Sequence, residues 1–161
     1  MEWQSMFRYH KWATQKLLDH VESQDASVFH QEAKNSFKSI SETYSHILSV
    51  DYIWYKRLTG IEKPEWIEFD VSTVSLTKKA FTKLHVEMEQ YFLTLSDDDW
   101  NQVLKFTNLR GDSFSNRREE MFFTFINHAS YHRGQVTSFL RQFDIAGTPI
   151  DYIYFSKESQ S

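Results

Sequence analysis

The chain has 161 residues, of which 40% are hydrophobic and 17% aromatic, enough for one well-packed domain spanning residues 1–161. Its formal charge of −4, with acidic and basic residues interleaved, argues against a nucleic-acid-binding surface, and the lack of cysteine excludes disulfides and thiolate ligands. With only four glycines and two prolines, the sequence favours long helices over a many-stranded sheet.

Four segments with helical spacing of their apolar residues predict an all-α fold, a four-helix bundle with crossover connections. In chain order these helices should span Glu2–Glu22, Ser36–Leu58, Ser75–Leu95 and Arg117–Phe143. The second helix is apolar around much of its circumference, so we expect it to be deeply buried.

Capping residues mark several helix ends. Ser39, with Glu42 three residues later, predicts a capping box slightly inside the start of the second helix. Asn116, with Glu119 three residues later, should begin the fourth helix. The residues expected to end helices are Gly60, Gly147 and Pro149.

The connections carry further signals. Residues 61–73 form an aromatic, proline-containing link, and Val103–Thr107 and Asp112–Asn116 flank Gly111 as a short β-hairpin before the last long helix. The tail Ile150–Phe155 is too apolar to remain in solvent, so we expect it to pack back on the bundle.

Two histidines, His128 and His132, lie in the apolar stripe of the fourth helix. The stripe consists of Met121, Phe125, His128, His132, Val136, Phe139 and Phe143, at spacings of three and four. Burying an imidazole costs free energy unless a partner satisfies it. A transition metal would satisfy both rings, because the i,i+4 spacing directs two ring nitrogens at one point.

His46, midway along the second helix, is the natural third ligand. Three imidazoles from two helices leave coordination positions open, which is typical of a catalytic rather than a structural metal. Zinc, nickel, iron and copper all suit such a donor set.

The other histidines have a simpler interpretation. We expect His20, His30 and His85 to lie on the surface or to bond a backbone carbonyl, whereas His10 falls on the inner face of the first helix and is a weaker ligand candidate.

Two better-known metal patterns are excluded. Zincin proteases need His-Glu-x-x-His, and here Ala129 occupies the glutamate position. Di-iron carboxylate bundles need a glutamate three residues before histidine, and none of the histidines is preceded in this way.

The chain resembles the DinB/YfiT-like metalloenzyme family over nearly its whole length. The most specific match is the block Asn127–Gln135, which reads His-x-x-x-His-Arg-Gly-Gln from His128. Further matches are Tyr9–Ala13 with Leu17 and Leu18, Thr43–Leu48 followed by Trp54 and Leu58, and Pro149-x-Asp151-Tyr152.

This resemblance implies a four-helix bundle with one divalent metal, most simply zinc or nickel, held by His46, His128 and His132. Characterised relatives include S-transferases and isomerases that use bacillithiol, mycothiol or glutathione, and dimers are common. We therefore expect a metal-dependent thiol S-transferase that acts on a small electrophile, as a homodimer without nucleic-acid partners. The alternative is a non-catalytic, metal-stabilised dimeric stress or binding protein.

An external thiol fits the composition, because a cysteine-free chain cannot supply its own sulfur nucleophile. No general acid or base is evident, since Glu42 and Asp51 lie on the second helix with no assigned direction. Arg133 should be a solvated cation or an ion-pair partner, or else hold an anionic substrate group. Gly134, in mid-helix, suggests close approach of another helix.

The first residues are neither basic nor followed by an apolar run, so we expect no signal peptide. No segment approaches the roughly 18 apolar residues that a membrane span needs. We therefore expect a cytoplasmic protein without membrane partners.

Overall fold

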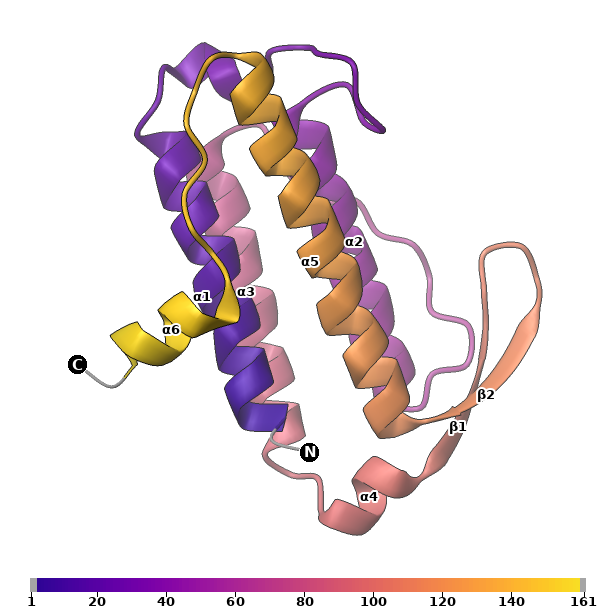
Figure 1. Cartoon of the computed structure of the whole chain (residues 1–161). Coiled ribbons are helices and arrows are strands. Elements are labelled where there is room, and N and C mark those ends of the chain that lie inside the picture. Colours follow the sequence, from indigo (N-terminus) through magenta and orange to yellow (C-terminus); the bar gives the residue numbers. More distant parts are fainter. Residues whose placement is uncertain (1–2, 160–161) are drawn as a thin grey trace.

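The computed structural model describes residues 3–159, in which four long helices form a bundle (Figure 1). These are α1 (Trp3–Glu22), α2 (Ile40–Leu58), α3 (Val74–Phe92) and α5 (Arg118–Gln142). Shorter elements connect or follow them: η1 (Ala26–Phe29), α4 (Asp97–Asn101), β1 (Val103–Thr107), β2 (Ser113–Arg117) and α6 (Tyr152–Glu158). The predicted all-α bundle with a hairpin before the last long helix is confirmed.

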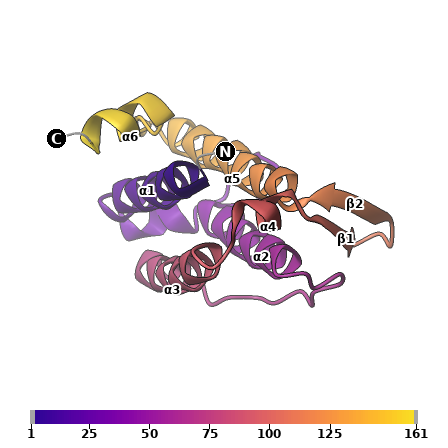
Figure 2. The ribbon, with the colours of Figure 1, turned by 90° about the horizontal axis from the view of Figure 1, so that it is seen from below.

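The helices occupy the corners of a square, so that α1 and α2 each pack against both α3 and α5 (Figure 2). Helices α2 and α3 run in the same direction, and residues 59–73 return along the length of the bundle to join them (Figure 1). This is the predicted crossover connection. The β1–β2 hairpin is antiparallel, pairs Phe106 with Phe114, and extends from the α2–α5 side.

The starts of α2, α3 and α5 differ from the predicted ones by one to four residues, because capping rather than apolar spacing sets them. The predicted start of the first helix, Glu2, lies outside the described residues. Helix α2 begins after Ser39, whose side chain accepts a hydrogen bond from the Glu42 N–H at 3.2 Å, so the predicted start at Ser36 is wrong. Helix α5 begins one residue later than predicted. Its N-cap is Arg117, whose N–H donates to the Glu120 carboxylate at 2.9 Å, in place of the predicted Asn116 and Glu119.

The helix ends show the same kind of difference. Helix α2 ends as predicted, with Gly60 at φ +94° after the C-cap. Helix α3 runs from Val74 to Phe92 rather than from Ser75 to Leu95. Helix α5 already ends at Gln142, where Asp144 turns the chain at φ +57°, so Gly147 and Pro149 do not end it.

The tail does pack back, as predicted, through the short helix α6. Phe155 is buried, and its ring lies 5.9 Å from that of Tyr9 and 5.7 Å from that of Trp12. Ile153 on the same helix is 71% exposed, so only one face of α6 contacts the bundle. None of the helices within residues 3–159 is long and apolar enough to cross a membrane.

Gly134 contradicts its sequence interpretation. It lies on an exposed side of α5, and a Cβ built there would have no neighbouring atom within 4 Å in the described part of the chain. Close approach of another helix is therefore not its cause. Gly147, by contrast, lies where a Cβ would come within 2.8 Å of the Thr137 Cγ2 atom.

Gly134→Ala should raise the free energy of unfolding by about 1 kcal/mol, because alanine is the better helix former and has space there. Gly147→Ala should lower it, because Thr137 or the chain must move. Urea denaturation followed by circular dichroism measures both. Destabilisation by Gly134→Ala would contradict the open environment seen here.

Candidate metal centre

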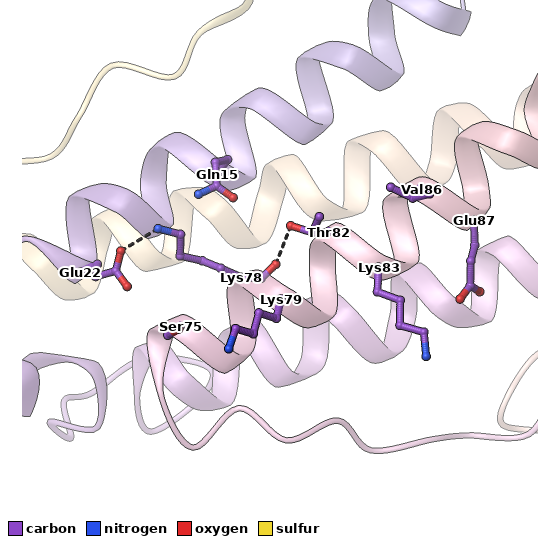
Figure 3. A pocket seen from close by; sticks show the side chains of 9 residues that line it. All are labelled: Gln15, Glu22, Ser75, Lys78, Lys79, Thr82, Lys83, Val86 and Glu87. Carbon is purple, nitrogen blue, oxygen red and sulfur yellow. Dashed lines mark hydrogen bonds and ion pairs between the residues drawn. The ribbon is translucent and has the colours of Figure 1, made fainter.

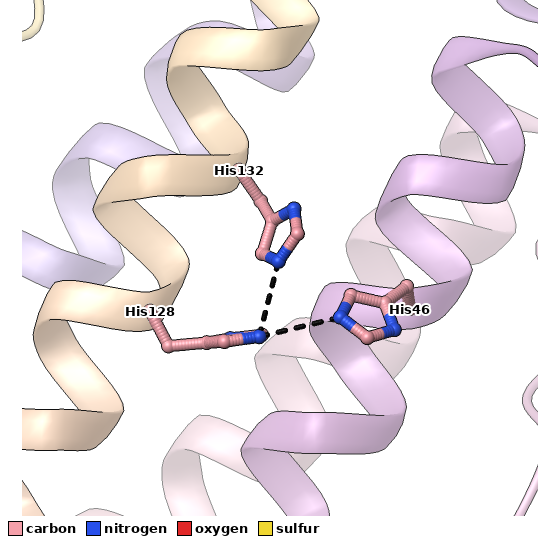
Figure 4. Close-up of side chains that lie close together, drawn as sticks. All are labelled: His46, His128 and His132. Carbon is pink, nitrogen blue, oxygen red and sulfur yellow. Dashed lines mark hydrogen bonds between the residues drawn. The ribbon is translucent and has the colours of Figure 1, made fainter. Parts of the chain in front are cut away.

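His46 of α2 and both His128 and His132 of α5 point toward one another across the seam between these helices (Figure 4). The Nε2 atom of His128 lies 3.2 Å from that of His46 and 3.0 Å from that of His132. The three residues predicted as ligands therefore bring three ring nitrogens to one place, and they form a group able to hold a metal ion.

The helix periodicity accounts for this placement. On α5, Phe125 and Val136 flank the two histidines along the helix and are 0% exposed. The same face that buries these apolar side chains therefore turns His128 and His132 toward α2. The histidines themselves are less enclosed, because His46 and His128 are partly exposed and only His132 is buried.

The electrostatics favour uncharged rings. Burial, followed by the proximity of His132, lowers the pKa of His46 to about 4 and that of His128 to about 3. Both imidazoles are therefore neutral near pH 7, the state in which histidine binds metals. Three ring nitrogens at such short range need shared protons or a cation between them.

Gln135 selects the tautomer of His132. The Nδ1–H group of His132 donates to the Gln135 side-chain oxygen at 2.7 Å, which leaves the Nε2 lone pair free for a metal. The Gln135 amide in turn donates to the Ser36 hydroxyl at 2.9 Å. His128 differs, since its buried Nδ1 atom has no hydrogen-bond partner among residues 3–159.

Aromatic side chains surround the three histidines. The Phe37 ring lies 4.8 Å from that of His46 and 5.6 Å from that of His132. The Trp66 ring is 6.4 Å from His46, and the Tyr131 ring is 5.0 Å from His132. Trp66 and Tyr131 are 42% and 65% exposed, so the group of aromatic side chains around the histidines is open to solvent on the side of these two residues.

Sequence reasoning did not find the parts played by Gln135, Phe37 and Trp66. Gln135 could have been recognised, because it lies three residues after His132 on the same helix face. Phe37 and Trp66 lie outside the helices, so no periodicity places them beside the histidines.

The remaining histidines separate into two groups. His20 and His30 bond the backbone carbonyls of Ala146 and Ser72, at 2.7 and 3.0 Å, in agreement with the prediction. His85 does not, because it is buried with its Nε2 atom 3.1 Å from that of His10. The spacing Phe81, His85, Met88, Phe92 follows one helix face and could have indicated its burial.

Arg133 does not fill the first of its three predicted roles, that of a solvated cation. It is 0% exposed, so it is not a solvated cation, and its guanidinium donates to His10, Thr14 and Ser130 rather than toward the three histidines. The sequence did not show where the side chains of Glu42 and Asp51 point. In the structure, Glu42 accepts a hydrogen bond from the Lys38 N–H at 3.0 Å, and Asp51 is 0% exposed inside the bundle.

A separate surface groove of about 640 Å³ lies between α1 and α3 (Figure 3). Three lysines line it, Lys78, Lys79 and Lys83, but Lys78 is held at 2.6 Å by both Asp19 and Glu22. The groove lies away from the three histidines, and none of its lining residues belongs to a group able to hold a metal ion within residues 3–159, so we do not assign the function to it.

Comparison with known proteins identifies relatives over most of the chain. The sequence profile of the DinB family matches residues 1–160. Protein DinB of Bacillus subtilis (strain 168) is 28% identical over 156 residues, which cover 91% of this chain and 89% of that protein.

Solved structures share the fold. A DinB-like protein from Bacillus cereus ATCC 10987 superposes with a TM-score of 0.72 at 19% identity, covering 91% of this chain and 94% of its own. YfiT from Bacillus subtilis, described as a probable metal-dependent hydrolase with an unusual four-helix bundle topology, gives 0.66 at 14% identity, with 90% and 89% covered.

Replacing any one of His46, His128 and His132 by alanine should remove one equivalent of bound divalent metal relative to the native protein, because the two remaining imidazoles hold an ion much less tightly than three. His20→Ala is the matched control and should bind as the native protein does. Elemental analysis after gel filtration measures both. The same metal content in the His46→Ala protein as in the native protein would contradict the predicted ligand set.

Gln135→Leu should weaken metal binding by about 10–100-fold, because His132 then loses the acceptor that fixes its tautomer. Gln135→Glu keeps an acceptor oxygen and should retain most of the affinity. Competition with a chelator of known affinity measures the dissociation constants, and equal constants for the two variants would contradict this role of Gln135.

Proposed function

The chain belongs to the DinB family, and from this premise we propose that it is a metal-dependent enzyme that joins a small thiol to an electrophilic carbon. The metal is a divalent transition ion, zinc or nickel in the simplest case, held by His46, His128 and His132. The observation that carries the proposal is the convergence of three histidine ring nitrogens at a partly exposed seam.

The donor set fits such an ion. The rings of His46 and His128 are unprotonated near neutral pH, and Gln135 leaves the metal-facing nitrogen of His132 free. Three protein ligands leave room for a substrate on the ion. When bound, the ion supplies one effect, a lowered pKa of a coordinating thiol or water.

The absence of cysteine supports an external thiol as the nucleophile. The chain's own residues would then position the two reactants. Phe37 and Trp66 offer apolar faces beside His46, which favours an electrophile with an apolar or aromatic body. In this reaction the thiol would lose its proton, a carbon–sulfur bond would form, and the leaving group of the electrophile would depart with its bonding electron pair.

Hydrolysis is the second candidate, and the structural likeness to YfiT favours it, because that protein is described as a probable metal-dependent hydrolase. The same three histidines would serve, with water in place of the thiol. A non-catalytic, metal-stabilised binding protein is the third possibility, and it predicts no turnover with either nucleophile.

The test follows loss of free thiol with 1-chloro-2,4-dinitrobenzene as electrophile and glutathione, bacillithiol or mycothiol as thiol. Protein reconstituted with zinc or nickel should consume thiol, His128→Ala should fall to the uncatalysed rate, and His20→Ala should match the native protein. Equal rates for native and His128→Ala protein with every thiol would overturn the proposal. Metal-dependent ester cleavage without thiol consumption would establish the hydrolase instead.

A further inference from the structure

A second group of metal-ligating side chains lies inside the bundle, and we propose that His10, Asp51 and His85 form a second site for a divalent transition metal. These residues come from α1, α2 and α3, whereas the first group lies between α2 and α5. The two groups share no residue.

The distances suit one ion. The Nε2 atom of His10 lies 3.1 Å from that of His85 and 3.2 Å from the Oδ2 atom of Asp51, and His85 lies 4.0 Å from the same oxygen. Ligands about 2.0–2.1 Å from a tetrahedral ion are separated from one another by roughly 3.3 Å. In both clusters the ligand atoms lie within 4.8 Å of one another.

Asp51 provides the second observation. Its side chain is 0% exposed. Its Oδ1 atom has no hydrogen-bond partner within residues 3–159, and its Oδ2 atom lies 3.2 and 4.0 Å from the Nε2 atoms of His10 and His85. Burying a carboxylate with so few partners is costly. A cation between the two imidazoles and this carboxylate removes that cost, and a bidentate Asp51 would raise the donor number from three to four.

The protonation states agree with this arrangement. Burial raises the pKa of Asp51 to about 6 and lowers that of His85 to about 4, and it also lowers the pKa of His10, with Arg133 acting in the same direction. Near pH 7 the carboxylate is therefore ionised and the imidazoles are neutral, as metal binding requires.

Arg133 lowers the affinity of this cluster for an ion, because its hydrogen bond to His10 competes with metal binding. Its Nη1 atom donates to the Nδ1 atom of His10 at 3.2 Å, so without a metal His10 carries its proton on Nε2. An ion has to replace that proton and break this hydrogen bond. The guanidinium keeps Thr14 and Ser130 as partners, at 3.2 and 2.8 Å, so the ion binds here more weakly than at the seam but does not leave Arg133 unpaired.

The burial of this cluster gives it a different role from the first group. His10 is 0% exposed and His85 is 6% exposed, so no face is open to a substrate. A closed site of this kind joins helices, and here it would connect α1, α2 and α3. The expected consequence is greater stability of the bundle rather than chemistry.

The test is a cobalt(II) titration, followed by visible absorbance and carried to equilibrium by prolonged incubation. Native protein should bind two equivalents, His46→Ala and Asp51→Asn one each, and His46→Ala/Asp51→Asn none. His20→Ala should still bind two. In the His46→Ala background cobalt should raise the melting temperature by several degrees, and this increase should vanish in the double variant.

The His46→Ala protein tests the second site while His10, Asp51 and His85 stay unchanged. A folding defect in Asp51→Asn therefore does not weaken the test. One equivalent in native protein and none in His46→Ala would overturn the second site while leaving the seam site standing. One equivalent in both would support the second site and instead overturn the ligand set on which the proposed function rests.

Discussion

The burial of Arg133 is the constraint on which the centre of this bundle depends. A guanidinium keeps its positive charge in a protein and can only donate hydrogen bonds. The Arg133 side chain is fully buried, so its guanidinium needs hydrogen-bond acceptors on several sides. The bundle supplies them from different helices: Thr14 and His10 of α1 and Ser130 of α5 itself. Because the Arg133 side chain lies between helices, its partners fix how α1 and α5 pack together.

The position of Arg133 in the sequence extends this constraint to the histidine seam. His132 directly precedes it, and successive residues on a helix are rotated by about 100°. When Arg133 points toward α1, His132 is turned toward α2 and His46. One short stretch of α5 therefore serves two polar centres on different sides of the helix, and the pairing of Arg133 with α1 limits rotation of α5 that would move His128 and His132 away from His46.

The seam residues were predictable because they follow local rules. His128 and His132 are four residues apart, so they lie on the same face of their helix whatever the tertiary structure. His46 lies on a helix whose composition already indicated burial. The central cluster was not predictable in this way. His10, Asp51 and His85 come from three helices, and their proximity depends on how those helices are rotated, which no local pattern specifies. Arg133 was misread for the same reason, since a charged residue beside a ligand is ordinarily solvated.

The two clusters differ in access as well as in ligand type. Both bring imidazoles within about one hydrogen-bond length of each other. At the seam, Trp66 and Tyr131 leave the outer side open, so an ion there can exchange ligands with a substrate. Inside the bundle, His10 and Asp51 are 0% exposed and His85 is 6% exposed, so an ion bound there would hold side chains in place. On these proposals, three imidazoles would support turnover at the seam of α2 and α5, and two imidazoles with a carboxylate would support stability between α1, α2 and α3.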